Sequence, residues 1–72
     1  MTLIRQLRKS QGLSVIELAR KSRVNPSILS EVERRRRAVS SNARRALAKF
    51  HKVPESAIFD SEGFALEEGK TA

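Results

Sequence analysis

The pattern of residues 12–33 limits the possible folds more than any other feature of this chain. Gly12 suits the left-handed position that follows the last turn of a helix. Ser14 and Glu17 then form a capping box, in which each side chain bonds a free backbone N–H at the start of the next helix. The sequence therefore predicts that one short helix ends just before Gly12 and that another spans residues 15–22.

A third helix is expected at residues 26–34, after a very short turn. Asn25 is a good N-cap, and Pro26 suits the first helical position because the missing N–H of proline costs nothing there. Leu29 and Val32 fall on one face of this helix, and small polar residues fall on the other. One face of this helix can thus pack against the domain while the other enters a DNA groove. A helix-turn-helix that reads DNA needs this arrangement.

Apolar residues at helical spacing predict three further helices, at residues 2–11, 41–52 and 54–59. The apolar stripe of the longest one is expected to consist of Ala43, Ala46, Leu47 and Phe50. The predicted fold class is all-α, with one compact domain of five helices over residues 1–59. Residues 60–72 contain four acidic side chains and two glycines, and we expect them to form a flexible acidic tail.

The charge of the chain is divided between a basic body and an acidic end. Residues 1–53 hold 14 of the 15 lysines and arginines and three of the eight acidic residues, a net charge of +11. Residues 54–72 hold one basic and five acidic residues, a net charge of −4. This asymmetry indicates a polyanionic partner for the body.

Four consecutive arginines, Arg34 to Arg37, follow the third predicted helix. Adjacent cations repel one another, so a partner that neutralises them is favoured over a merely solvated loop. DNA phosphates would do so, and Arg36 or Arg37 could also enter a narrowed minor groove. Arg44 is a further candidate for phosphate contact, with a surface ion pair as the alternative.

The exposed side of the third helix is expected to approach base edges. Serine can bond any base and so reads little by itself, whereas Glu31 could accept from a cytosine amino group. Ile28 could contact a thymine methyl group or simply pack against a neighbouring helix. The candidate DNA-binding residues are Asn25, Pro26, Ser27, Ile28, Ser30, Glu31, Arg34, Arg35, Arg36, Arg37 and Arg44. Direct readout by so few contacts should be modest.

Over residues 1–59, the chain resembles the Cro/phage-repressor class of helix-turn-helix proteins, also called the xenobiotic-response-element (XRE) family. The matching residues include Leu3, Leu7, Arg8, Gly12-Leu13-Ser14, Glu17-Leu18-Ala19, Val24, Ser27, Leu29, Ser30, Val32 and Glu33. The resemblance implies a five-helix domain whose third helix lies in the major groove, and dimers that bind two-fold operators as repressors or autoregulators. It also implies a structural ion pair between Arg8 and Glu33.

Five residues depart from the usual pattern of this family, and one of them is Val39, which stands where a proline often precedes the residue at Ser40. Val15 stands where a glutamine often contacts the DNA backbone, and His51 stands where leucine is common. Arg23 and Arg35 each replace a glycine. Arg23 must therefore adopt a left-handed backbone or reshape the turn.

A chain this small buries little apolar surface, so we expect a homodimer. Ile58 and Phe59 are the candidate dimer surface, although they could equally belong to the core of one chain. A second function is also open, because the same fold could bind a protein, as an antitoxin or an inhibitor of another regulator. In that case Phe64 and Leu66 of the acidic tail would be the contact points.

Other function classes are disfavoured. No cysteine is present and His51 is the only histidine, so neither a disulfide nor a metal site is expected. We expect no cofactor and no enzymatic activity, because no catalytic set or glycine-rich phosphate loop is recognisable. RNA binding is disfavoured because no exposed aromatic residues are expected to stack bases. No stretch approaches the roughly 20 apolar residues of a membrane span, and no signal-peptide core is evident. The expected compartment is the cytoplasm, of bacterial or phage type, with the protein on the nucleoid when bound.

Overall fold

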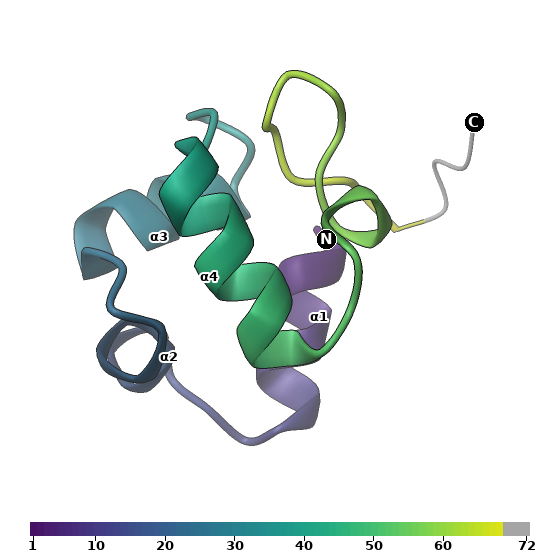
Figure 1. Cartoon of the computed structure of the whole chain (residues 1–72). Helices are drawn as coiled ribbons and strands as arrows, with labels where there is room; N and C mark the ends of the chain where they lie inside the picture. The colour runs from purple at the N-terminus through teal and green to yellow at the C-terminus, as the bar shows by residue number, and fades with distance from the viewer. Residues whose placement is uncertain (69–72) are drawn as a thin grey trace.

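The computed structural model describes residues 1–68. It contains four α-helices and one 3-10 turn, which are α1 (Leu3–Ser10), α2 (Val15–Ser22), α3 (Pro26–Glu33), α4 (Ser41–His51) and η1 (Glu55–Ala57). In Figure 1, α4 lies between the α2–α3 pair and α1. The predicted all-α fold is confirmed, and its fifth helix is a single 3-10 turn. No helix of the described chain is long and apolar enough to cross a membrane.

Helices α2 and α3 begin at the caps that the sequence predicts. The N–H of Glu17 donates to Ser14 Oγ at 3.1 Å, and the N–H of Ser14 donates to Glu17 Oε1 at 2.9 Å. Asn25 Oδ1 accepts from two backbone N–H groups of α3, at 2.8 and 3.2 Å. Arg23 follows α2 with a left-handed backbone, φ 62°, so the turn keeps its shape although this residue is not glycine. The turn is therefore short, and α2 and α3 pack against each other.

The core lies where the helices meet. Its fully buried large side chains are Ile4, Leu18, Leu29, Val32, Leu47 and Ile58. The inward face of α4 differs from the predicted stripe, because Ala48 and His51 are buried beside Leu47, whereas Phe50 is only partly buried. The helix is thus turned by about one residue from the expected face. Helix α4 has both α2 and η1 as neighbours, and Phe50 lies at the edge of the core.

Residues 60–68 return to the body of the domain instead of forming a loose tail. The N–H of Leu3 donates to Leu66 O at 2.8 Å, and Ala65 is fully buried. The expectation of a flexible tail therefore does not hold for this part of the chain. Its polar composition gives no indication of these backbone hydrogen bonds to α1. Residues 69–72, the rest of the expected tail, lie outside the described residues.

Gly63 brings this C-terminal segment against the loop before α4. The N–H of Val39 donates to Gly63 O at 2.9 Å, and Gly63 has φ 90°. A Cβ atom at Gly63 would lie 3.0 Å from Val39 O, which is too close for an ordinary contact. A residue without a side chain is therefore needed at this crossing.

Ile58 and Phe59 belong to the core of a single chain. They are only 2% and 3% exposed. Ile58 O accepts from the N–H of Leu66 at 2.9 Å, and Phe59 pairs with Ala65 in an isolated antiparallel bridge. This burial favours the alternative in which the two side chains belong to the core of one chain, because the C-terminal segment already packs against them.

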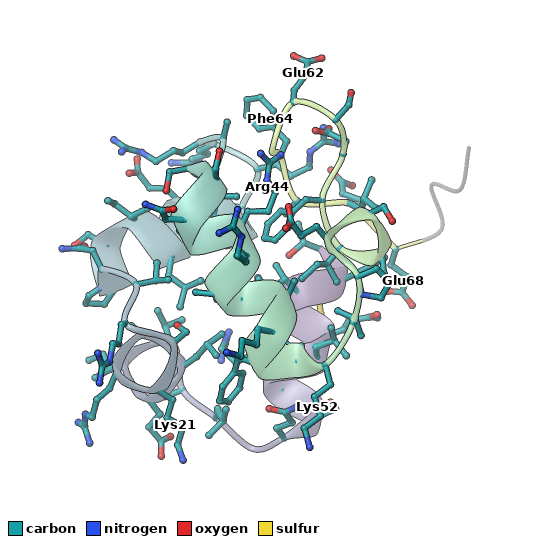
Figure 2. All side chains as sticks on the ribbon, in the orientation of Figure 1. Lys21, Arg44, Lys52, Glu62, Phe64 and Glu68 are labelled. Carbon is teal, nitrogen blue, oxygen red and sulfur yellow. The ribbon has the colours of Figure 1, made fainter. Side chains whose placement is uncertain are left out.

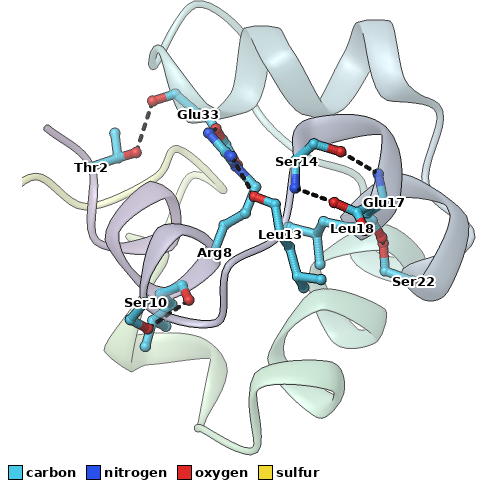
Figure 3. A network of polar contacts seen from close by, with 10 residues as sticks. Thr2, Arg8, Ser10, Leu13, Ser14, Glu17, Leu18, Ser22 and Glu33 are labelled. Atoms are coloured by element: carbon cyan, nitrogen blue, oxygen red, sulfur yellow. Dashed lines mark hydrogen bonds and ion pairs between the residues drawn. The ribbon is translucent and has the colours of Figure 1, made fainter.

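A buried ion pair between Arg8 and Glu33 joins α1 to α3 (Figure 3). Arg8 Nε and Nη2 donate to the two carboxylate oxygens of Glu33 at 2.8 and 3.1 Å, and Nη1 donates to Leu13 O at 2.8 Å. The hydroxyl of Thr2 donates to the backbone O of Glu33 at 2.8 Å. The two charged side chains are only 10% and 4% exposed. Because every nitrogen of the guanidinium and both carboxylate oxygens are bonded, the cost of desolvating the two charges is offset.

His51 is a buried titratable group without a polar partner. It is 7% exposed, and neither ring nitrogen has a hydrogen-bond partner in the described part of the chain. The ring of Phe50 lies edge-on to it, with 5.2 Å between the ring centroids. Burial lowers the pKa of His51 below its ordinary value, and the carboxylate of Glu33 opposes this shift in part. The neutral imidazole is therefore favoured in the folded state.

We expect Glu33→Gln to lower the free energy of unfolding by about 3–5 kcal/mol, because Arg8 would keep its charge in a buried place without a counter-ion. Urea unfolding followed by circular dichroism measures this loss. The matched control is Glu31→Gln, which removes the carboxylate of an exposed pair with Arg37 and should cost at most about 1 kcal/mol. Equal losses in the two variants would contradict a structural role for the buried pair.

The stability of the protein should fall in mild acid because of His51. As the pH drops below the ordinary histidine pKa of 6.5, the unfolded chain takes up a proton that the folded chain resists, so the free energy of unfolding decreases until the lower folded-state pKa is passed. His51→Leu cannot titrate and should lose this part of the pH dependence. Urea unfolding of both proteins between about pH 5 and 8 tests this, and parallel pH profiles would refute it.

Candidate nucleic-acid interface

Helix α3 presents a polar face to solvent. Pro26, Ser27 and Glu31 are exposed on it, and Ser30 is half-buried. The opposite face is buried and consists of Leu29, Val32 and Glu33. Asn25 is also exposed, with its side-chain oxygen occupied in capping the helix. The accessible side of α3 is therefore the side that the sequence predicts to approach base edges.

Ile28 is an exception on this helix, because it is half-buried and packs against the core. It lines a cleft together with Ala43 of α4. Ile28 thus has apolar contacts within its own chain. This placement favours the packing alternative over contact with a thymine methyl group.

A cleft of about 340 Å³ opens between the turn before α3 and the start of α4. Its polar lining consists of Arg23, Asn25, Arg37, Ser40 and Asn42. Helices α3 and α4 both begin at its rim. The N–H groups of the first turn of α3 are already bonded to Asn25, so it is the N-terminus of α4 that can attract an anion through backbone N–H groups. Two arginine side chains add full positive charges. The cleft therefore has the chemistry to hold a phosphate group.

Arg23 and Asn42 are residues of this cleft that sequence reasoning missed. In the sequence, Arg23 stands out as a departure from glycine in the turn, and its positive charge at that point is the signal for a phosphate ligand. Asn42 carries no comparable local indication. Its place in the cleft depends on how α4 packs beside the α2–α3 turn, which the sequence pattern does not reveal.

The four consecutive arginines have different environments. Arg34, Arg36 and Arg37 are exposed, whereas Arg35 is half-buried. Arg37 Nε lies 3.3 Å from Glu31 Oε1 in an exposed pair. Arg34 and Arg36 form no ion pair within the part of the chain that the structure describes. Three of the four guanidinium groups are therefore accessible to a polyanion.

Arg35 turns away from this group toward the C-terminal segment. Its backbone is left-handed, φ 59°, at a position where the sequence comparison expected glycine. Its guanidinium nitrogens lie 3.5 Å from Asp60 Oδ2 and 3.8 Å from Glu67 Oε1, and the group sits 6.0 Å from the centre of the Phe64 ring. Arg35 therefore has two carboxylates and an aromatic ring as partners within its own chain.

Arg44 also finds its partner within the chain. Its Nε lies 3.2 Å from Glu55 Oε1 of η1. In Figure 2, Arg44 lies next to the C-terminal loop that carries Glu62 and Phe64. This geometry favours the surface ion pair over the phosphate contact that was the other alternative for Arg44.

The surface formed by α3, the arginines after it and the adjacent cleft has groups suited to binding a polyanion. Its exposed side chains carry guanidinium ions and hydroxyls, which suit phosphate oxygens and base edges. Among residues 1–68, no three His, Cys, Asp or Glu side chains lie close enough to hold a metal ion.

A family model described as helix-turn-helix matches residues 4–58 of the chain. The matched region is more than half of the sequence and runs from α1 to the end of η1. It therefore includes α2, α3 and the cleft between the α2–α3 turn and α4. Neither a curated protein nor a solved structure matches the chain.

Proposed function

We propose that the protein is a repressor or autoregulator that reads the major groove with α3. The starting point is that the chain belongs to the helix-turn-helix family of DNA-binding transcription regulators, of the Cro/phage-repressor (XRE) type. The observation that carries this proposal is the exposed polar face of α3 next to three accessible arginines. The family is a regulatory one and is not typically enzymatic. We place the protein on nucleoid DNA in the cytoplasm.

Phosphate contacts would position the domain on the duplex. Arg34 and Arg36 would bind phosphates on one side of α3, and the cleft with Arg23 and Arg37 would bind a phosphate at the other side of the groove. Each neutralised phosphate releases condensed counter-ions, so binding should weaken steeply as salt is added. These contacts give affinity and orientation without sequence information.

Base contacts would come from few residues of α3. Ser27 lies in its exposed first turn, where recognition helices contact base edges. Glu31 is paired with Arg37 in the free protein. If Arg37 moves to a phosphate, Glu31 becomes free to accept a hydrogen bond from a cytosine amino group. A modest direct readout then follows, supported by the shape of the DNA.

We propose further that the protein binds a two-fold operator as a homodimer. Two copies of α3 would then enter successive major grooves on one face of the duplex, about 34 Å apart. The alternative, a protein-binding module that uses Phe64 and Leu66, has less support. Both side chains are half-buried, and Arg35 lies over the Phe64 ring.

Adjacent arginines allow a test of the phosphate contacts. Arg36→Ala should weaken binding to all duplex sequences and reduce the slope of log affinity against log salt by about 1. Arg35→Ala is the matched control, because this guanidinium is held by Asp60, Glu67 and Phe64, and its loss should change the salt slope little. Fluorescence anisotropy across a salt series measures both. Equal changes in the slope would refute this division of roles.

Selection of bound sequences from a random duplex library tests the proposed function itself. The wild-type protein should enrich a two-fold motif, and Ser27→Ala should alter the preferred bases at one position of each half-site. Ser56→Ala removes an exposed serine from η1 and should leave the motif unchanged. Salt-sensitive binding with no enriched motif would disprove operator recognition, and an unchanged motif in Ser27→Ala would remove Ser27 from the readout.

A further inference from the structure

A groove of about 410 Å³ runs along α1. It is lined by Leu3, Gln6, Leu7 and Ser10 of α1, with Val53 and Ala57 opposite. The four residues of α1 recur at positions i, i+3, i+4 and i+7, so they form a single stripe along the helix. The floor of the groove is apolar, because Ile58 of the core also contributes to it.

Helix α1 therefore has one buried face and a second, partly exposed apolar stripe. Ile4 is fully buried in the core, and Arg8 is bonded to Glu33. Leu3 and Leu7, on the groove side, are only partly buried. The polar residues of the stripe are a glutamine and a serine, and neither carries a charge. Charged residues are depleted at the centre of protein interfaces, so this lining has the composition of an interface core.

Exposed side chains of opposite charge, Lys52 and Glu68, lie beyond the two ends of the groove. Exposed Lys52 precedes Val53, at the end of the groove where Ser10 lies. Exposed Glu68 lies at the other end, where its N–H donates to Met1 O at 2.9 Å. Figure 2 shows Lys52 and Glu68 on the side of the molecule where α1 lies. Such a surface is complementary to a copy of itself that is rotated by 180° about an axis through its middle.

We propose that this groove is the homodimer interface and that a second copy of the chain occupies it with two-fold symmetry. Lys52 then faces the partner's Glu68, and the same pair occurs a second time by symmetry. The apolar groove residues of the two copies meet between these pairs. In Figure 1, α3 begins on the far side of α4 from α1, so the interface leaves the DNA-facing side of α3 accessible. The inference rests on the proposed function in one respect, since a two-fold operator calls for a dimer.

Sedimentation velocity of the full chain without DNA, over a wide range of concentration, should show a reversible monomer–dimer equilibrium. Leu7→Asp should raise the dimer dissociation constant by more than about tenfold, because it places a charge in the centre of the interface. The matched control is Ile16→Asp, which changes an apolar side chain that is 62% exposed on α2 outside the groove. This control should dimerise like the wild-type protein.

Charge reversal provides a second test that leaves the apolar lining intact. Lys52→Glu and Glu68→Lys each break both symmetric ion pairs of the dimer. Each broken pair should raise the dimer dissociation constant by about two- to fivefold. The double variant should recover dimerisation, because the reversed charges attract again. This recovery cannot arise from a loss of folding, so the inference stays testable even if Leu7→Asp does not fold.

A wild-type protein that stays monomeric at every concentration would overturn the inference. A dimer that tolerates both Leu7→Asp and the single charge reversals would also overturn it, as would a dimer that only Ile16→Asp disrupts. Since these measurements contain no DNA, their failure is distinct from a failure of the proposed function. A monomer that still enriches an operator motif would leave DNA reading intact and remove only the dimer surface.

Discussion

The guanidinium of Arg8 connects three parts of a domain whose core is small. It bonds both carboxylate oxygens of Glu33 in α3 and the carbonyl of Leu13 in the loop before α2. A buried charge pair offsets its desolvation only in one geometry, because any shift leaves a donor or an acceptor unbonded. Helix α3 is therefore held at a set orientation to α1 and α2. The direction in which α3 exposes Ser27 and Glu31 depends on this bond.

A second constraint is that some of the positive charge is neutralised within the chain, while the rest remains available to a ligand. Acidic residues near the C-terminus neutralise some arginines, since Arg35 pairs with Asp60 and Glu67, and Arg44 pairs with Glu55. These arginines lie on the side of the C-terminal segment. Among the other arginines that follow α3, Arg34 and Arg36 have no such partner within the described residues, and Arg37 has only the exposed Glu31. The basic body thus retains its net charge where α3 is exposed, which is where a phosphate backbone would run.

Helix α1 links the stability of the domain to its proposed assembly. One of its faces carries Ile4 and Arg8 into the core, and the other presents Leu3 and Leu7 to the groove. A chain of 72 residues is too short for its other elements to cover both faces of this helix. A second copy would cover the outer face, and its two-fold axis would set the distance between the two α3 helices on DNA.

The amino-acid sequence by itself determined the local features of this protein. The starts of α2 and α3 and the polar face of α3 follow from side chains that bond to or pack on nearby backbone. At Arg23 the sequence left two conformations open, and the structure has the left-handed one. Contacts between distant segments were decided only by the tertiary structure. The burial of Ile58 and Phe59, the rotation of α4 toward Ala48, and the inward turn of Arg35 all depend on where residues 60–68 or a neighbouring helix pack. Helical periodicity gives the spacing of a face and leaves open which of two adjacent faces the rest of the chain will cover.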